Sequence, residues 1–177
     1  MMRDPDFAAD LARYPPHPFR KEQSIWAISA YRFGRRTLKR RPGPMRWLCM
    51  KIYRVRHRVA ETLSGVSLPL EAQIGPGLRI YHFGNIFVHG AAVIGANCTL
   101  RQGVTIGDRV TGGPAPVLED DVELGAYAQI LGPVRIGRGA KIGAMAVVLC
   151  DVPPGATAVG IPARVLEKKT IGGESSL

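Results

Sequence analysis

The 177-residue chain lacks two features that would place it in or beyond a membrane. No apolar run approaches the roughly 18 to 20 residues that a membrane-spanning helix needs. The opening stretch MMRDPDFAAD carries acidic residues where an export signal needs a basic and then an apolar stretch. These two absences predict a cytoplasmic protein.

Cysteine is also scarce. The three cysteines, Cys49, Cys98 and Cys150, are widely separated, and the sequence contains no CxxC pair. An odd number without close pairs fits reduced thiols better than a disulfide framework or a zinc site, so we expect no bound metal. Aromatic residues make up only 7% of the chain, so small aliphatic side chains must fill its core.

Acidic residues are few in the first third of the chain. Residues 1–60 hold 15 of the 24 lysines and arginines but 4 of the 14 acidic residues, a net charge of +11. The other residues carry 9 basic and 10 acidic side chains. The chain is therefore a basic N-terminal segment joined to a nearly neutral C-terminal one.

Apolar spacing within the basic segment predicts two helices, separated by an Arg-Pro-Gly-Pro break. The first spans residues 22–38 and is expected to place Trp26, Ala30 and Phe33 on one face. The second spans about 45–63. Its inward side chains are expected to be Trp47, Leu48, Ile52, Val55 and Val59.

Three kinds of partner could explain the basic charge. Nucleic acid is not expected, because no binding motif accompanies the charge. An anionic membrane attracts each nearby basic residue by on the order of 1 kcal/mol, and Trp26, Phe33 and Trp47 could insert into it. An acidic or lipid-linked glycan is the third candidate, and a solvated helical face needs no partner. We expect peripheral contact with the inner membrane face.

The rest of the chain follows a period of six. A large aliphatic residue returns at every sixth position, and a small or β-branched residue stands two places before the next one. A helix would repeat every 3.6 residues and an alternating strand every 2. The large residues are Leu118, Leu124, Ile130, Ile136, Ile142 and Val148 and, upstream in a frame with one two-residue slip, Ile74, Ile80, Ile86, Ile94, Leu100 and Ile106.

A period of six fits short strands joined by tight turns, three of which close one triangular coil of about 18 residues. Stacked coils bury together what one coil cannot bury alone. The pattern predicts a mainly β fold, a parallel β-helix over residues 67–168, preceded by the helical segment 1–66 and followed by a flexible tail, 169–177. The register breaks at 109–116, which predicts a loop that leaves the β-helix.

Three stretches carry a resemblance to a known family. They are the repeats themselves, Tyr81-His-Phe-Gly-Asn85, and the ending DVPPGATAVGIPAR from Asp151 to Arg164. They resemble the serine acetyltransferase family of hexapeptide-repeat acyltransferases, most closely its relatives from exopolysaccharide gene clusters, the colanic acid acetyltransferases. The resemblance covers residues 24–168. It implies a left-handed β-helix and a homotrimer, which could pair into a dimer of trimers, with active sites between neighbouring prisms.

Acetyl transfer from acetyl-CoA, the expected co-substrate, to a hydroxyl needs a base, donors for the oxyanion and a groove for CoA. Histidine suits the base role because imidazole titrates near neutrality. His82 matches the family's catalytic histidine and is the predicted general base. His89 is expected to line the site or to form a hydrogen bond at a coil edge, whereas His17 and His57 are expected on the surface.

The resemblance fails at two places that concern the acceptor. Serine acetyltransferases carry Asp-Arg-His-Pro on the loop before the next coil, and that Arg is expected to hold the serine carboxylate. Here residues 114–116 read Pro-Ala-Pro, and Arg109 cannot be assigned the missing role. Serine acetyltransferases also carry an acidic residue before the first coil. Here Ser67 stands at that position, with Glu71 nearby in the sequence. His89, Glu71 and Arg109 are therefore acceptor-site candidates, and the loss of a charge-assisted pair disfavours free serine.

The same resemblance supplies candidates for CoA binding. Each of them also fits ordinary coil packing or solvated surface. The candidates are backbone contacts at Gly107, Asp108, Ala126 and Ala144 and, for the CoA phosphates, Lys141, Arg164 and Lys168.

These observations predict an acetyl-CoA-dependent O-acetyltransferase that acts on a saccharide hydroxyl, free or lipid-linked, in surface or exopolysaccharide biosynthesis. The alternative is serine O-acetylation for cysteine synthesis. A non-catalytic β-helix scaffold is the reading outside the enzymes, and His82 with the CoA pattern disfavours it. Zinc carbonic anhydrases share this β-helix but need three histidines, and residues 67–168 contain only His82 and His89.

Overall fold

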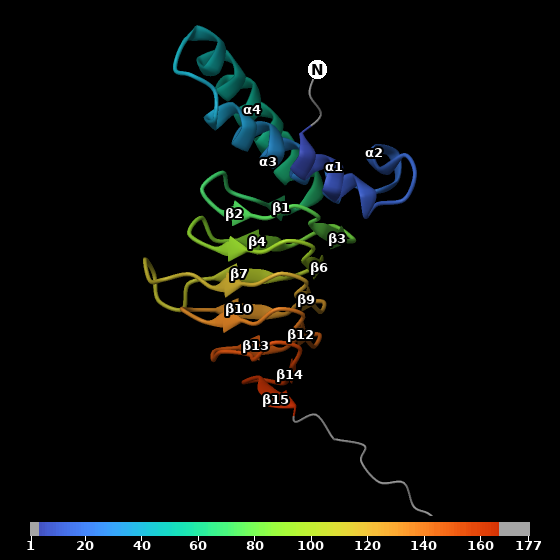
Figure 1. The fold of residues 1–177 in the computed structure, drawn as a ribbon, viewed down its shortest axis with the longest axis vertical. Helices are drawn as coiled ribbons and strands as arrows, with labels where there is room; N and C mark the ends of the chain where they lie inside the picture. Colours follow the sequence, from blue (N-terminus) through green and yellow to red (C-terminus); the bar gives the residue numbers. More distant parts are fainter. Residues whose placement is uncertain (1–3, 167–177) are drawn as a thin grey trace, which may run out of the picture.

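The computed structural model describes residues 4–166, in which a group of helices lies above an elongated β prism (Figure 1). The predicted tail at 169–177 and the CoA candidate Lys168 lie outside these residues. The helical cap, as we call residues 5–64, contains four helices. They are α1 (Pro5–Ala12), α2 (Pro18–Lys21), α3 (Ser24–Leu38) and α4 (Pro44–Ser64).

The prism has three faces of parallel strands, and as far as β13 each face receives every third strand of the chain. Face A contains β1 (Val66–Ser67), β4 (Ile86–Val88), β7 (Thr105–Gly107), β10 (Gln129–Leu131) and β13 (Val147–Val148). Face B contains β2 (Gln73–Ile74), β5 (Val93–Ile94), β8 (Val117–Leu118) and β11 (Arg135–Ile136). Face C contains β3 (Arg79–Tyr81), β6 (Thr99–Arg101), β9 (Glu123–Leu124), β12 (Lys141–Ile142), β14 (Thr157–Val159) and, antiparallel to it, β15 (Arg164–Leu166).

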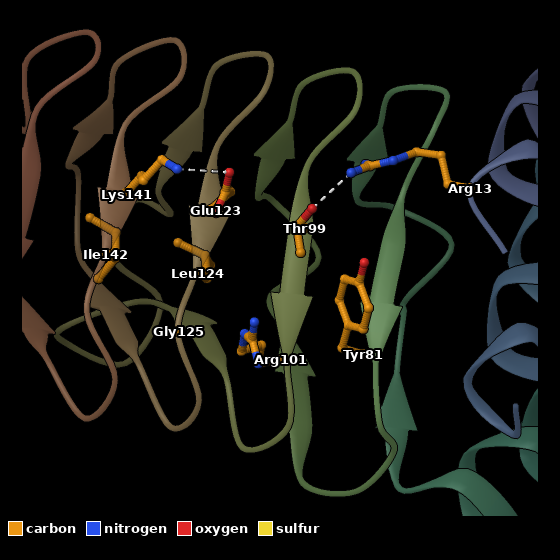
Figure 2. Close-up of a pocket in the computed structure, with 9 residues that line it drawn as sticks. All are labelled: Arg13, Tyr81, Thr99, Arg101, Glu123, Leu124, Gly125, Lys141 and Ile142. Carbon is orange, nitrogen blue, oxygen red and sulfur yellow. Dashed lines mark hydrogen bonds and ion pairs between the residues drawn. The ribbon is translucent and has the colours of Figure 1, made fainter.

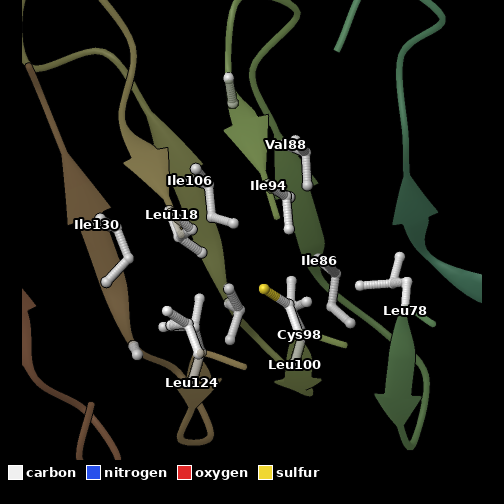
Figure 3. Close-up of a cluster of buried hydrophobic side chains, with 14 of the residues drawn as sticks. Leu78, Ile86, Val88, Ile94, Cys98, Leu100, Ile106, Leu118, Leu124 and Ile130 are labelled. Atoms are coloured by element: carbon white, nitrogen blue, oxygen red, sulfur yellow. The ribbon is translucent and has the colours of Figure 1, made fainter. Parts of the chain in front are cut away.

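The register of these strands stacks the repeated aliphatic residues on one another. On face C, Ile80 lies beside Leu100, and Leu100 lies beside Leu124. All twelve of the predicted inward residues are buried, and Figure 3 shows part of the resulting column. The small residues that precede them fill the corners and are buried too. These are Val122, Ala128, Val134, Ala140, Ala146 and Val152. The predicted β-helix is therefore confirmed.

The predicted excursion from the prism lies between β7 and β8. Residues 108–116 leave face A before the chain re-enters at face B, and residues 109–112 are exposed. In Figure 1 this loop extends from the left side of the prism at the level of β7 and β10. The interruption of the six-residue period therefore marks a loop that adds no rung to the core.

Polar side chains attach the cap to the first coil of the prism. Arg32 forms a buried ion pair with Asp10, with Nε to Oδ2 at 2.7 Å, and it also donates to the carbonyl of Ile74 at 2.7 Å. Asp10 accepts the backbone N–H of Leu78 at 2.8 Å. Beside them, Tyr31 donates to the carbonyl of Ala72 at 2.8 Å. The top of the prism is thus closed by groups that satisfy its free backbone atoms.

The predicted helices correspond to α3 and α4, but both predicted apolar faces need correction. On α3, Ile28 is fully buried, whereas Trp26 and Phe33 are only partly buried, because α3 contacts both the prism and α4. The apolar spacing did not predict α1, whose N-terminus is capped by the Asp4 carboxylate. A short helix that begins with proline offers little periodicity to detect.

The predicted inward face of α4 is wrong. Tyr53, Ala60 and Ser64 are the buried residues of this helix, and Tyr53 reaches α3 where Gly34 leaves no side chain in its way. The residues predicted inward are instead exposed, namely Trp47, Leu48, Ile52, Val55 and Val59. None of the helices within residues 4–166 is long and apolar enough to cross a bilayer.

Candidate active site

His82 lies on the turn between face C and face A. The turns that make this step, residues 82–85, 102–104, 125–128 and 143–146, form what we call the C–A corner. His82 follows β3 directly, has a left-handed backbone (φ 65°), and its side chain is exposed. An exposed imidazole at a fixed turn can accept a proton from a substrate that approaches from solvent.

Each later turn of the C–A corner also contains a residue with positive φ. Gly103, Tyr127 and Met145 all have positive φ, at 73°, 58° and 59°. The turns are joined by backbone bonds, including Gly103 N–H to the carbonyl of Gly84 at 3.1 Å and Tyr127 N–H to that of Gln102 at 2.8 Å. The corner is therefore a regular ridge that runs down the prism from His82.

The residue before His82 is the middle of a stack of aromatic and guanidinium groups. The guanidinium carbon of Arg79 lies 3.8 Å from the ring centroid of Tyr14 and 4.3 Å from that of Tyr81. That of Arg101 lies 5.6 Å from the Tyr81 ring. Arg79 also pairs with Glu22 at 3.0 Å, which ties the stack to the helical cap.

A pocket of about 370 Å³ opens on face C at this stack (Figure 2). Tyr81 and Arg101 lie on neighbouring strands in direct register. Arg13 reaches the pocket from the cap and donates to Thr99 Oγ1 at 2.9 Å. Further down, Lys141 pairs with Glu123 at 3.3 Å. The pocket thus carries three cationic groups and one carboxylate; His82 is not one of its lining residues, but it follows the lining residue Tyr81 in the chain.

The three acceptor-site candidates do not join His82 within one chain. Glu71, His89 and Arg109 lie on turns that lead from face A to face B, at the other edge of face A. Glu71 and His89 are close in space, because the turn at Gly90 lies against Glu71. The Nδ1 atom of His89 accepts the backbone N–H of Ala91 at 3.1 Å, and Arg109 packs beside Gly132.

The CoA candidates are divided between two edges of face A. Ala126 and Ala144 lie on the C–A corner below His82, and both are accessible to solvent. Gly107 ends β7 at the opposite edge, and Asp108 there accepts the backbone N–H of Gly112 at 2.8 Å, which shapes the loop. Lys141 and Arg164 are exposed on face C. A single prism therefore does not assemble all of them into one groove.

The other histidines and the cysteines lie away from the C–A corner. His57 on α4 stacks on Tyr53, and its Nε2 is 3.8 Å from Glu61. Cys98 is buried, and burial raises its pKa to about 11, which makes it a poor nucleophile near neutral pH. Cys150 is exposed on a different turn, and Cys49 is partly buried.

Two pocket residues, Tyr81 and Arg101, are absent from the sequence prediction. The signal for them was available in the alternation of the strands. Each follows an inward residue of the repeat, Ile80 or Leu100, so each must point outward from face C, Tyr81 next to the turn that carries His82 and Arg101 next to the following turn of the C–A corner. Arg13 could not be found in this way, because it reaches the pocket from a helix that the spacing did not predict.

Comparison with known proteins identifies the architecture. Residues 115–150 match the family model "Bacterial transferase hexapeptide (six repeats)", and residues 92–111 match "Hexapeptide repeat of succinyl-transferase". The serine acetyltransferase of Salmonella typhimurium is 37% identical over 148 residues, which cover 80% of this chain and 50% of that protein. Soybean serine acetyltransferase complexed with serine superimposes with a TM-score of 0.78 at 33% identity, over 92% of this chain and 70% of the soybean chain.

The chain belongs to the serine acetyltransferase family. A solved serine acetyltransferase in complex with CoA is also similar, with a TM-score of 0.76 at 29% identity, over 91% of this chain and 68% of that one. The predicted closeness to exopolysaccharide acetyltransferases is not supported by these relatives. The prediction of a saccharide acceptor is wrong, since the curated and structural relatives are serine acetyltransferases.

The chain spans about half the length of the curated serine acetyltransferases that it matches. The prediction against serine depended on two local differences, the Pro-Ala-Pro loop at 114–116 and Ser67 in place of an acid. Such differences remove particular contacts, but they do not identify the acceptor, because another side chain can supply a lost charge from a different part of the site.

Proposed function

We propose that this chain is an acetyl-CoA-dependent acetyltransferase that converts L-serine to O-acetylserine. The observation that carries the proposal is an exposed histidine, His82, on the C–A corner of a serine acetyltransferase-family prism. The relatives supply the acceptor, because one is solved complexed with serine and another in complex with CoA.

In the proposed reaction, His82 removes the proton of the serine hydroxyl while its oxygen attacks the thioester carbonyl. The resulting tetrahedral oxyanion collapses, the carbon–sulfur bond breaks, and the proton on His82 passes to the CoA thiolate. The products are O-acetylserine and CoA. No covalent enzyme intermediate is needed, which agrees with the burial of Cys98 and the raised pKa of its thiol.

CoA is proposed to lie along the C–A corner against Ala126 and Ala144, with Lys141 or Arg164 near its phosphates. Small side chains let a pantetheine arm approach the backbone closely. Gly107 and Asp108 would complete the site from a neighbouring copy in a homotrimer. The placement of the candidates at two edges of face A supports this arrangement, because a second prism can bring one edge opposite the other.

The proposal is tested by measuring CoA release from acetyl-CoA with L-serine as acceptor. The His82→Ala variant is expected to lose activity by about 10²- to 10⁴-fold, the usual contribution of a general base. His57→Gln, on the helical cap, is the matched control and is expected to retain full activity. Wild-type protein that releases no CoA with serine would refute the acceptor, and an active His82→Ala variant would refute the mechanism.

We also propose that α4 makes peripheral contact with an anionic membrane. Its exposed apolar residues form one stripe at helical spacing, and Lys51, Arg54 and Arg58 lie exposed along one side of it. Between Pro44 and Ser64 the only acidic residue is Glu61, so a second copy would meet like charge whereas an anionic lipid surface would not. The stripe consists of Met45, Leu48, Ile52, Val55, Val59 and Leu63, which are between 43% and 65% exposed.

This contact is tested by co-sedimentation with vesicles of phosphatidylcholine alone or with phosphatidylglycerol. Binding is expected only with the anionic lipid and is expected to fall with added salt. Val55→Glu should abolish it, whereas Val165→Glu at the far end of the prism should not. Equal binding to neutral and anionic vesicles would overturn the proposal. A Val55→Glu variant that changes the oligomeric state but not vesicle binding would overturn it too.

A further inference from the structure

We propose that Arg101 binds the carboxylate of the amino-acid acceptor. The inference rests on the proposed acetylation of serine. It concerns a residue that neither the repeat pattern nor the family resemblance singles out. The argument depends on where Arg101 lies, on which cations of the pocket are already engaged, and on what holds its guanidinium in place.

Arg101 lies one coil below the residue that precedes His82. Tyr81 and Arg101 are in direct register on β3 and β6, and both point outward from face C (Figure 2). Neighbouring strands are about 4.8 Å apart, and successive residues on a strand about 3.3 Å. A small zwitterion can therefore place its hydroxyl at His82 while its carboxylate reaches the guanidinium of Arg101.

The other two cations of the pocket are engaged by the protein. Arg13 donates to the carbonyls of Gly77 and Cys98, at 2.6 and 3.0 Å, and to Thr99. Lys141 pairs with Glu123. By contrast, no carboxylate among residues 4–166 lies within 4.0 Å of the Arg101 guanidinium, which lies over the Tyr81 ring, 5.6 Å from its centroid. Arg101 is the cation that an anionic ligand can bind without breaking an existing pair.

The guanidinium of Arg101 is positioned by a stack that begins in the helical cap. Tyr14 and Tyr81 both contact Arg79, which is itself 5% exposed and is paired with Glu22. The Tyr81 ring, 4.3 Å from the Arg79 guanidinium carbon, thus links Arg101 to this paired and buried group. A planar guanidinium held in one orientation loses less entropy when it binds a carboxylate with two parallel hydrogen bonds.

The experiment compares two acceptors that differ in the carboxylate. L-serine and L-serinamide both carry the amino group and the primary hydroxyl, but only serine has the anion. In Arg101→Gln, we expect KM for serine to rise about 10- to 100-fold, as for loss of one charge-assisted contact. KM for serinamide and for acetyl-CoA should stay unchanged. Arg101→Lys should recover part of the loss, and Arg135→Gln, an exposed arginine on face B, should behave as wild type.

The outcomes separate this inference from the proposed function. If wild-type protein acetylates serine and Arg101→Gln does so with the same KM, the inference is wrong and the function stands. If Arg101→Gln weakens serine and serinamide equally, Arg101 has a structural role and the inference is likewise overturned. If wild-type protein does not acetylate serine, both fail. A selective rise in KM for serine is the supporting result.

Discussion

The prism and the helical cap differ in the kind of contacts that stabilise them. Each coil of the prism adds similar aliphatic residues, such as Leu100 and Leu124, and the contacts join positions about one coil apart in the chain. The cap shares apolar residues such as Ile25 with the core of the prism, and it adds buried polar groups, with Arg32, Asp10 and Tyr31 bonded to the first coil. The prism is therefore a local repeated structure, whereas the cap depends on a few specific long-range contacts.

This difference predicts how each region tolerates substitution. When one aliphatic side chain of the prism is truncated, the packing contacts of that coil are lost, while the contacts between the other coils remain. A buried ion pair leaves an uncompensated charge when one partner is removed. We therefore expect the largest single effect at the junction between the two regions, although the prism contains most of the buried apolar surface.

Asp10→Ala is expected to have the largest effect on stability. The change leaves the Arg32 guanidinium, 4% exposed, without its carboxylate, and it removes the acceptor for the Leu78 N–H. Loss of one partner from a buried pair costs about 3–5 kcal/mol. Trp26 and Trp47 both lie in the cap, so tryptophan fluorescence during urea unfolding reports on the cap alone.

The control is the double variant Asp10→Leu with Arg32→Met, which removes both charges. Its loss of stability is expected to be smaller than the sum of the two single losses, because no charge is left unpaired. If the single and double losses simply add, the ion pair does not join cap and prism in the way described. If Asp10→Ala costs the cap less stability by fluorescence than Leu100→Ala costs the prism by circular dichroism, the ranking of the two regions is reversed.

Leu100→Ala is expected to have the next largest effect. Leu100 is fully buried between Ile80 and Leu124, and truncation of a buried leucine costs about 2–5 kcal/mol, with values at the lower end where neighbours can collapse. Val110→Ala, on the exposed 108–116 loop, should change stability by less than about 0.5 kcal/mol. Unfolding followed by circular dichroism gives both values, and equal losses would argue against a packed core at this rung.

The same difference explains what could be predicted from the sequence. Rungs such as Ile80, Leu100 and Leu124 are recognisable because each has the same local environment, so the period alone identifies them. The loop at 109–116 is recognisable for the same reason, as a break in that period. His82 is predicted as the general base because it matches the family's catalytic histidine. Its place on a turn follows from the six-residue period, which ends a strand at Tyr81.

The cap could not be predicted in the same detail, because its contacts are neither periodic nor local. Asp10 and Arg32 are ordinary surface residues by composition, and only the fold brings them to the open end of the prism. The apolar residues of α4, among them Ile52 and Val55, follow a helical stripe that is typical of a core face. Here that face is exposed, because Tyr53 occupies the contact with α3. Arg13 reaches the pocket from the C-cap of α1 for the same long-range reason.

Cys98 offers the smallest and most selective test, since it lies in a small-residue position of the prism and titrates. Burial raises its pKa to about 11 from an ordinary 9.0, so the folded state holds its proton where the unfolded state has released it. The resulting stability is fully present below pH 9 and is lost as the pH rises from 9 to 11. Relative to Cys98→Ala, wild-type protein should therefore lose on the order of 1 kcal/mol by pH 10, measured as the difference between urea unfolding curves at pH 8 and pH 10. The buried tyrosines titrate in both proteins and cancel in this difference. If the stabilities of wild-type protein and Cys98→Ala change equally with pH, the Cys98 thiolate is no more desolvated in the folded prism than in the unfolded chain.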